Sequence, residues 1–144
     1  MTLSNDLTIE QIQENFEFLE EWKERFTYLI ELGQSLPPMD DADKTEANKV
    51  HGCQALVHMK ATLTESTPAT LELIASSDAH IVNGIIALMM IMYSGKQPAE
   101  ILQINAEGAL ATMGLDQHLS PTRRNGMHSM IKRIRELATG YVNG

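Results

Sequence analysis

Apolar side chains recur along the first part of the chain with the spacing of amphipathic helices. Residues 9–19 repeat apolar positions every three or four residues, and Thr8 with Gln11 has the spacing of a capping box. A second stripe covers residues 20–36 and stops at two consecutive prolines. We therefore predict two helices, followed by a polar loop over residues 39–50.

The hydrophobic period changes to two immediately after this loop. Apolar and polar residues alternate over Gln54–Leu63 and again over Thr70–Ser76, which is typical of half-buried strands. The intervening sequence "ESTPA" is rich in turn-forming residues. The pattern predicts an antiparallel β-hairpin from these two strands.

The second half of the chain returns to helical patterns. The stretch "IVNGIIALMMIMY" is apolar on almost every side, which indicates a buried central helix, and "SSDAH" before it offers capping side chains. A short helix is expected from Pro98, and Ser120 with Pro121 is expected to start a final helix. Helices on both sides of a hairpin predict an α+β fold, with a small antiparallel sheet packed against helices. The chain is expected to form one domain over residues 1–144, with residues 1–7 open to disorder.

Net charge restricts the partners that this chain can have. The formal charge is -8, so nucleic acid and anionic membranes are poor partners. The longest apolar run, residues 81–93, is shorter than the roughly 20 residues that cross a bilayer, and the N-terminus does not resemble a signal peptide. With a single thiol, the composition favours a reducing, cytoplasmic location. Acidic residues gather over residues 10–31, and basic residues gather in "TRRNGMHSMIKRIRE". This asymmetry indicates either solvated helix faces or surfaces that steer a protein partner.

Cys53 is the only cysteine, and its sequence context allows two interpretations. It shares the parity of the apolar strand positions, which favours a buried core residue. However, Gly52 precedes it at a loop–strand junction, which favours an exposed, reactive thiol. A reactive thiol would need a lowered pKa, for which His51 and Lys49 are near in sequence, while Arg123 and Arg124 in the first turn of the last helix are candidates through space.

Two further chemistries are open to the same residues. His51, Cys53 and His58 could contribute to a zinc site, but no second cysteine or acidic cluster completes a tetrahedral set. Any of the five histidines could pair with the cysteine in a hydrolase, but no segment has a protease signature. We therefore expect no metal.

Several separated motifs resemble the SufE family, the sulfur-acceptor proteins of iron–sulfur cluster assembly, of which the CsdE branch is a close relative. They include "YLIELGQSLPPM", "KTEANKVHGCQALV", "SSDAHIVNGIIALM", "GKQPAEIL" and "MGLDQHLSPTRRNGM", in this order along residues 18–138. The resemblance implies a single SufE-like domain with the α+β sandwich fold shared with IscU-type scaffold proteins.

The resemblance also implies a function. Family members accept persulfide sulfur from a cysteine desulfurase of the SufS/CsdA type, and the cysteine of "GCQ", here Cys53, is the acceptor. They stimulate the desulfurase and deliver sulfur to a SufBCD-like scaffold. PLP belongs to the desulfurase, so this chain is expected to hold no cofactor and to act as a sulfurtransferase-like accessory protein rather than a self-contained enzyme. An interaction-only regulator and a small thiol enzyme are the alternatives.

By the same resemblance, supporting or partner-binding roles fall on residues around the acceptor: Gly52, His51, Gln54, Ser77, Asp78 and Arg123. Arg123 would pair with the thiolate, the persulfide or the partner, unless it is only a helix-surface residue. Ser77 and Asp78 belong to the turn before the central helix and would otherwise act as caps.

The chain departs from the family pattern at two positions. His58 stands where many members have an aromatic residue, and Ser76 stands where many have aspartate. His58 leaves room for a pH-sensitive loop. We further expect Cys53 to rest in or near an apolar pocket and to swing out when a partner docks.

Overall fold

The computed structural model describes residues 7–143, which form seven α-helices, two 3₁₀ turns and a two-stranded sheet. The elements follow the chain in this order: α1 (Ile9–Phe18), α2 (Trp22–Gln34), η1 (Asp41–Asp43), η2 (Glu46–Asn48), β1 (Val57–Leu63), β2 (Leu71–Ser77), α3 (His80–Tyr93), α4 (Pro98–Ile101), α5 (Ala106–Thr112), α6 (Leu115–His118) and α7 (Pro121–Asn143). The predicted α+β class is confirmed. The expectation for residues 1–6 lies outside the described residues, whereas Leu7 packs against the core.

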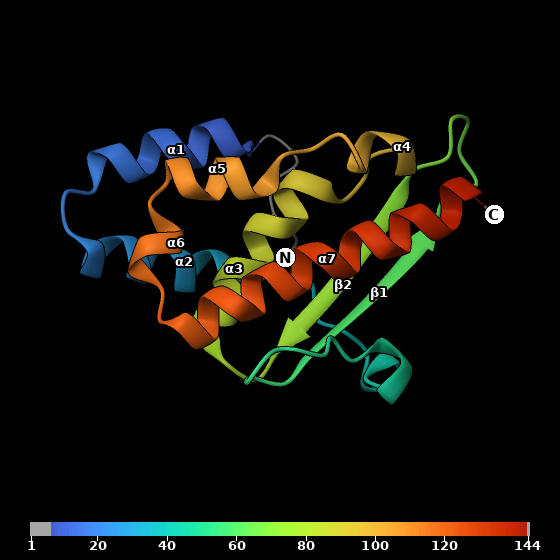
Figure 1. The fold of residues 1–144 in the computed structure, drawn as a ribbon, viewed down its shortest axis with the longest axis horizontal. Helices are drawn as coiled ribbons and strands as arrows, with labels where there is room; N and C mark the ends of the chain where they lie inside the picture. Colours follow the sequence, from blue (N-terminus) through green and yellow to red (C-terminus); the bar gives the residue numbers. More distant parts are fainter. Residues whose placement is uncertain (1–6, 144) are drawn as a thin grey trace.

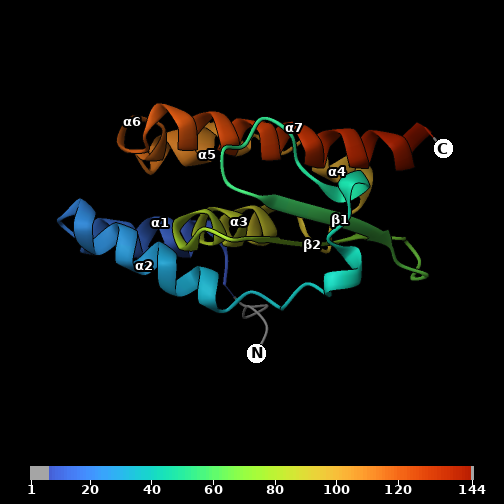
Figure 2. The ribbon, with the colours of Figure 1, turned by 90° about the horizontal axis from the view of Figure 1, so that it is seen from below.

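The elements are arranged in layers around α3. Figure 1 shows α7 running alongside the hairpin, and Figure 2 shows that α7 lies over it, in one layer with α5 and α6. On its other side, α3 packs most extensively against α2. The two backbones approach closely because Gly84 faces Leu29, where a side-chain carbon at position 84 would stand 2.4 Å from the Leu29 carbonyl oxygen. The central helix is therefore enclosed between two helical layers.

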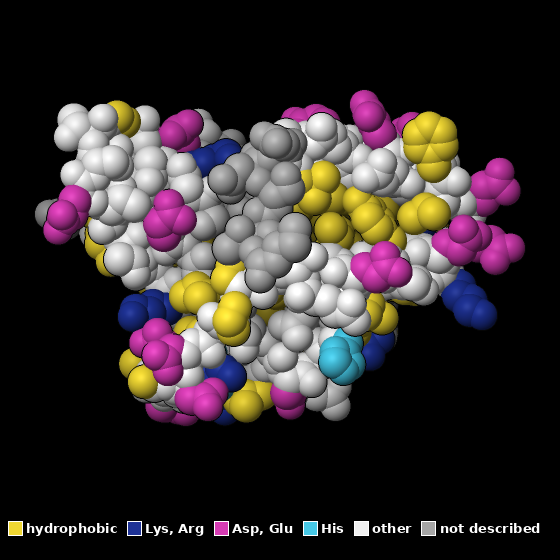
Figure 3. Space-filling model, turned by 180° about the vertical axis from the view of Figure 1, so that it is seen from behind, with side chains coloured by type: hydrophobic (Ala, Val, Ile, Leu, Met, Phe, Trp, Pro, Cys, Tyr) yellow, Lys and Arg dark blue, Asp and Glu magenta, His cyan; other side chains and the backbone are white. Residues whose placement is uncertain are grey.

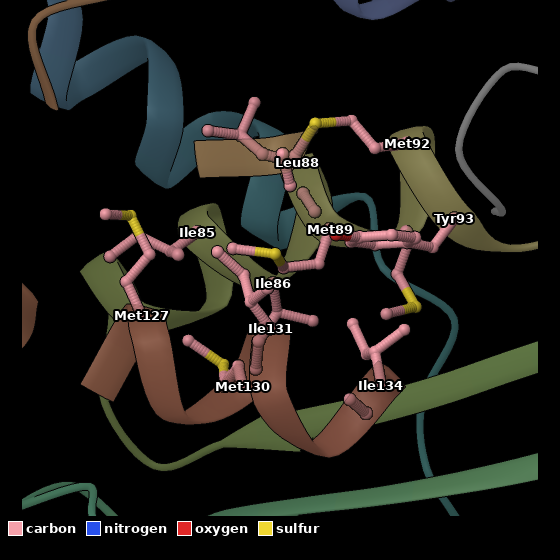
Figure 4. Packing of buried hydrophobic residues seen from close by; sticks show 14 of the residues in the cluster. Ile85, Ile86, Leu88, Met89, Met92, Tyr93, Met127, Met130, Ile131 and Ile134 are labelled. Carbon is pink, nitrogen blue, oxygen red and sulfur yellow. The ribbon is translucent and has the colours of Figure 1, made fainter. Parts of the chain in front are cut away.

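Buried aliphatic and sulfur-containing side chains fill the space between α3 and α7. Figure 4 shows the α7 side chains Met127, Met130, Ile131 and Ile134 directed at the apolar face of α3. The α3 residues in this core include Ile85, Leu88 and Met89, all buried. The nearly all-apolar sequence of α3 follows from its position, since protein covers it on most sides. The predicted buried central helix is confirmed.

Local signals at helix starts were predicted correctly. Thr8 caps α1, its hydroxyl accepts the Gln11 N–H, and the Gln11 side chain accepts the Thr8 N–H, which completes the capping box. Ser120 Oγ accepts the Arg123 N–H at 3.3 Å, and α7 begins at Pro121 as expected. These signals are reliable because each involves residues within one turn of the helix.

The hairpin is confirmed, with its strands displaced from the predicted bounds. The strands pair antiparallel from Val57 opposite Ser77 to Leu63 opposite Leu71. The first strand begins at Val57 rather than at Gln54, because the chain turns before it and Leu56 bonds outside the ladder. The strand therefore does not reach back to Cys53, and strand parity does not determine where the thiol points.

Two other local predictions are corrected by the structure, and two helices lie where none was predicted. Residues 39–50 contain the turns η1 and η2 rather than an unbroken loop. The residues of "SSD" do not cap α3, whose N-cap is Ala79 without a side-chain cap bond. Instead, Ser77 is bound at both its N–H and its carbonyl by the side chain of Asn83, which ties the end of β2 to α3. Helices α5 and α6 were not predicted.

Candidate functional site

The loop that carries Cys53 is closed at its base by a backbone hydrogen bond. The Val50 N–H donates to the Val57 carbonyl at 2.9 Å, and Lys49 forms a bridge with His58. Residues 51–56 between these contacts therefore form a short loop that projects from the start of β1. His58 itself lies within β1, next to this loop, and is buried at 8% exposure.

The turn at Gly52 needs the absence of a side chain. Its φ angle is +93°, in the region that L-residues rarely adopt. A side-chain carbon there would also stand 2.4 Å from Ser129 Oγ, so the loop rests its backbone directly against α7. Gly52 therefore fixes both the direction of the loop and its distance from the helix.

Cys53 also contacts α7, about one turn closer to the start of the helix than the contact between Gly52 and Ser129. Its thiol donates a weak hydrogen bond to the Gly126 carbonyl, with an S···O distance of 3.5 Å. Gly126 is buried and lacks a side chain, and a carbon added there would stand 3.4 Å from Cys53 Sγ. The thiol thus packs on bare helix backbone and is half-buried.

This environment keeps the thiol protonated at rest. Burial raises the pKa of the Cys53 thiol above its ordinary value. The thiolate, not the thiol, is the nucleophile, so the resting cysteine is weakly reactive. No neighbouring cation offsets this effect in the resting position, so the lowering of the pKa that a reactive thiol would need does not come from His51, Lys49 or Arg123 here. Activation requires that the environment of the thiol change.

A cavity of about 300 Å³ opens beside the thiol. Its walls come from three segments that are far apart in sequence: the loop that carries Cys53, the start of α3 with the residues just before it, and the first three turns of α7. It is lined by Cys53, Gln54, Ala55, Asp78, Ala79, Val82, Ile85, Thr122, Arg123, Gly126 and Met130. Apolar walls from α3 and α7 therefore meet a polar edge formed by Gln54, Asp78 and Arg123.

Asp78 holds the far end of the loop. Its carboxylate accepts the Leu56 N–H at 3.1 Å, and its own N–H donates to the Leu56 carbonyl at 3.3 Å. The Ser77 hydroxyl lies 3.5 Å from the same carboxylate and accepts the Ala79 N–H at 3.1 Å. Both residues therefore act on the connection between the loop, β2 and α3.

The structure brings together only some of the residues that the sequence singled out. Cys53, Gln54, Asp78 and Arg123 line one cavity, and Gly52 positions the loop. His51 lies on the other side of the loop, where its Nε2 is 3.7 Å from Glu46 Oε1. The remaining first-turn arginine, at position 124, donates to the Asp116 carbonyl. It is therefore occupied outside the cavity.

Sequence reasoning missed the contribution of α7 and α3 to this cavity, notably Gly126, Met130 and Val82. Gly126 carried a usable signal, because glycine inside a helix is unfavourable and often marks a close backbone approach. The apolar residues carried none, since their spacing fits the core equally well.

The described part of the chain offers neither a cluster of metal ligands nor a membrane span. Within residues 7–143, no group of three or more His, Cys, Asp and Glu side chains is placed to hold a metal ion. None of the helices in that range combines the length and apolar character that a bilayer crossing requires.

Comparison with known proteins places the chain in a family. Residues 10–138 match the family model SufE, described as an Fe-S metabolism associated domain. An uncharacterized SufE-like protein of Rhizobium meliloti (strain 1021) is 41% identical over 136 residues, which cover 94% of this chain and 97% of that protein. An uncharacterized SufE-like protein of Rhizobium etli is 41% identical over 133 residues, covering 91% and 89%.

A solved structure supports the fold independently. The solution structure of a hypothetical protein from Thermus thermophilus superimposes with a TM-score of 0.75 over 100% of both chains at 20% identity. At this identity the likeness extends to the fold alone. The family match and the relatives, taken with the fold, show that the chain belongs to the SufE family of domains associated with Fe–S metabolism.

Proposed function

We propose that this protein accepts sulfane sulfur on Cys53 from a cysteine desulfurase and passes it on for iron–sulfur cluster assembly. The observation that carries the proposal is the position of the chain's only cysteine, at the mouth of a cavity and on a loop held by specific contacts. A family associated with Fe–S metabolism needs a source of sulfur, and a thiol is the group that can carry it.

The transfer step is a thiol–persulfide exchange. The Cys53 thiolate attacks the outer sulfur of the donor persulfide, the donor's S–S bond breaks, and its cysteine leaves as thiolate. A new S–S bond forms on Cys53, and the proton lost by Cys53 is balanced by protonation of the donor thiolate. The sulfane sulfur keeps its oxidation level, so no external oxidant or reductant is consumed.

The cavity suits a labile cargo. Its volume of about 300 Å³ exceeds the roughly 30 Å³ that one water molecule takes up in the liquid, so an added sulfur atom fits beside the thiol. Apolar walls from Val82, Ile85 and Met130 limit access by water and by other thiols. We expect the loop to leave this position when a partner docks, because only a deprotonated, accessible thiol reacts quickly.

The polar edge of the cavity supplies the remaining roles. Arg123 is exposed and lines the same cavity as the thiol, so it is the residue proposed to pair with the persulfide anion or with the partner. Gln54 is exposed beside it and is proposed to contact the partner. Gly52, Ser77 and Asp78 are proposed to position the loop, and His51 to shape its outer side.

The partners follow from the chemistry. The sulfur donor is a SufS/CsdA-like desulfurase that brings its own PLP, and the sulfur acceptor is a SufBCD-like scaffold complex. The reaction requires a compartment that keeps thiols reduced, such as the cytoplasm. In this proposal the chain is an accessory sulfurtransferase that also raises the turnover of the desulfurase, since removing the persulfide product frees the donor cysteine.

Intact-mass measurement tests the proposal directly. The protein is incubated with a cysteine desulfurase, PLP and L-cysteine, and then weighed with and without reductant. We expect a gain of one sulfur mass that reductant reverses and that Cys53→Ser abolishes. Desulfurase turnover is measured in parallel with both proteins. Stimulation that survives Cys53→Ser would indicate an interaction-only regulator, and an unchanged mass with several desulfurases would overturn the proposal.

A further inference from the structure

A second cavity lies on the opposite side of the loop of residues 51–56, which carries Cys53 and is called the acceptor loop below. It has a volume of about 530 Å³ and is formed by residues 46–52 together with one face of α7. The α7 residues that line it are Ser129, Lys132, Arg133 and Glu136. We refer to this space as the rear cavity, and to the one beside the thiol as the front cavity.

The loop itself divides the two cavities. Cys53 packs on Gly126 of α7, and Gly52 packs on Ser129, one turn further along the same helix. Residues 122–130 of α7 contribute to the front cavity, whereas residues 129–136 contribute to the rear one. A molecule seated in the rear cavity would therefore touch the segment that carries the thiol without blocking the thiol.

The rear cavity concentrates positive charge on an acidic protein. Lys49, Lys132 and Arg133 line it, although the chain has only 11 Lys and Arg against 19 Asp and Glu. In the view from behind, Figure 3 shows Lys and Arg side chains scattered among Asp and Glu side chains. Glu46 and Glu136 also line the cavity, so its three cations outnumber its carboxylates and the lining is net positive, which favours an anionic group.

Part of this charge has no partner within the described chain. The two acids of the cavity are already engaged: Glu46 lies 3.7 Å from His51, and Glu136 lies 3.8 Å from Arg133. Among the described side chains, no carboxylate lies within 4.0 Å of the ammonium group of Lys49 or Lys132. These two lysines are available for an external anion.

The cations do not serve the thiol. Burial raises the pKa of the Cys53 thiol, and no charged neighbour offsets this effect. A set of cations placed to activate the cysteine would lower that pKa instead. Their position behind the loop therefore points to a binding role rather than a catalytic one.

We propose that the rear cavity receives an acidic segment of the protein partner that exchanges sulfur with Cys53, with Lys49 and Lys132 as the ion-pairing residues. This inference rests on the proposed function for the identity of that partner. Lys132 is six residues from Gly126, or about 9 Å along α7, so both cavities fit beneath one interface of about 800 Å² per partner. A partner that pairs with the rear cavity while it meets the thiol contacts both sides of the loop.

The first test uses an acidic peptide as probe. The ¹⁵N-labelled protein is titrated with a hexaglutamate peptide at low salt, and amide shifts are followed. We expect shifts in residues 46–52 and 129–136, and about tenfold weaker binding in the double variant Lys49→Glu/Lys132→Glu. The matched control, Lys23→Glu/Lys96→Glu, changes net charge equally and should bind as the wild type does. Equal weakening in the two double variants, or no peptide binding, would overturn the proposal, as would inorganic phosphate binding as tightly as the peptide.

The second test separates this inference from the proposed function. Each protein is loaded at Cys53 either by a desulfurase with L-cysteine or by inorganic polysulfide, which needs no docking surface. Lys49→Glu/Lys132→Glu should accept sulfur from polysulfide at the wild-type rate but from the desulfurase several-fold more slowly. Equal desulfurase rates in both proteins would overturn the docking proposal alone. Failure of the wild type with both donors would overturn the proposed function, and the peptide titration would still decide whether the rear cavity binds acidic segments.

Discussion

Replacing Gly52 with alanine would test how the acceptor loop is held against α7. The change has two costs that can be worked out separately. A non-glycine residue at a φ of +93° costs about 1–2 kcal/mol in backbone conformation. The new carbon would also stand 2.4 Å from Ser129 Oγ, and relieving such a contact costs about 1–3 kcal/mol. We expect a total loss of about 2–5 kcal/mol in the free energy of unfolding.

Gly95 provides a matched control for the backbone cost. Its φ angle is +81°, but the nearest atom to an added side-chain carbon is Glu72 Oε1 at 4.0 Å. Gly95→Ala should therefore lose only about 1–2 kcal/mol. Adding Ser129→Ala to Gly52→Ala removes the crowded hydroxyl and should recover most of the difference between the two glycine variants.

Urea unfolding gives these free energies, because the midpoint and the slope together define stability in water. Alkylation of Cys53 by iodoacetamide in the native state provides a second reading. A loop forced away from α7 moves the thiol off Gly126, so Gly52→Ala should react faster than Gly95→Ala. The reasoning is refuted if both glycine variants lose the same stability, or if Ser129→Ala recovers none of it.

Three further changes test the site and the core. Asp78→Ala should speed native-state alkylation of Cys53 several-fold, because the Leu56 N–H loses the carboxylate that holds it. Asp78→Asn keeps an accepting oxygen and should change the rate little. Equal alkylation rates in the two variants would show that this hydrogen bond does not hold the loop. The pH at half-maximal alkylation rate should be higher in the native protein than in urea. Burial raises the pKa of the Cys53 thiol, so the folded chain keeps the thiol proton to higher pH. Coincident pH profiles for the native and unfolded protein would contradict this prediction. Tyr93→Phe should raise the free energy of unfolding by up to about 1 kcal/mol, since the buried hydroxyl has no hydrogen-bond partner among the described residues. A lower free energy of unfolding in urea would mean instead that the hydroxyl has a partner.

The sequence was sufficient where structure depends on neighbours in the chain. The capping box of Thr8 and Gln11, the start of α7 at Pro121 and the hairpin alternation each involve local geometry, and all three are present. The buried central helix was predictable for a related reason. A stretch that is apolar on almost every side has no stable place at a surface.

The sequence was insufficient where distant segments decide the outcome. The strand begins at Val57 because Leu56 bonds to Asp78, 22 positions away, and no local pattern encodes that choice. The thiol is sheltered by Gly126 of α7 rather than by the strand face that its parity suggested. The cysteine was identified from its motif, but its raised pKa depends on burial against a helix that follows much later in the chain.

The acceptor loop is a tether with a fixed length. It is anchored at Val50 by the bond to Val57 and at Leu56 by the bonds to Asp78. Cys53 stands three residues from each anchor, and three residues span at most about 10–11 Å. While both anchors hold, the thiol cannot search a large volume for its donor. Under the proposed function, a donor cysteine would therefore be brought to it on a projecting segment, and the chain would select partners by the shape of their surface as well as by their chemistry.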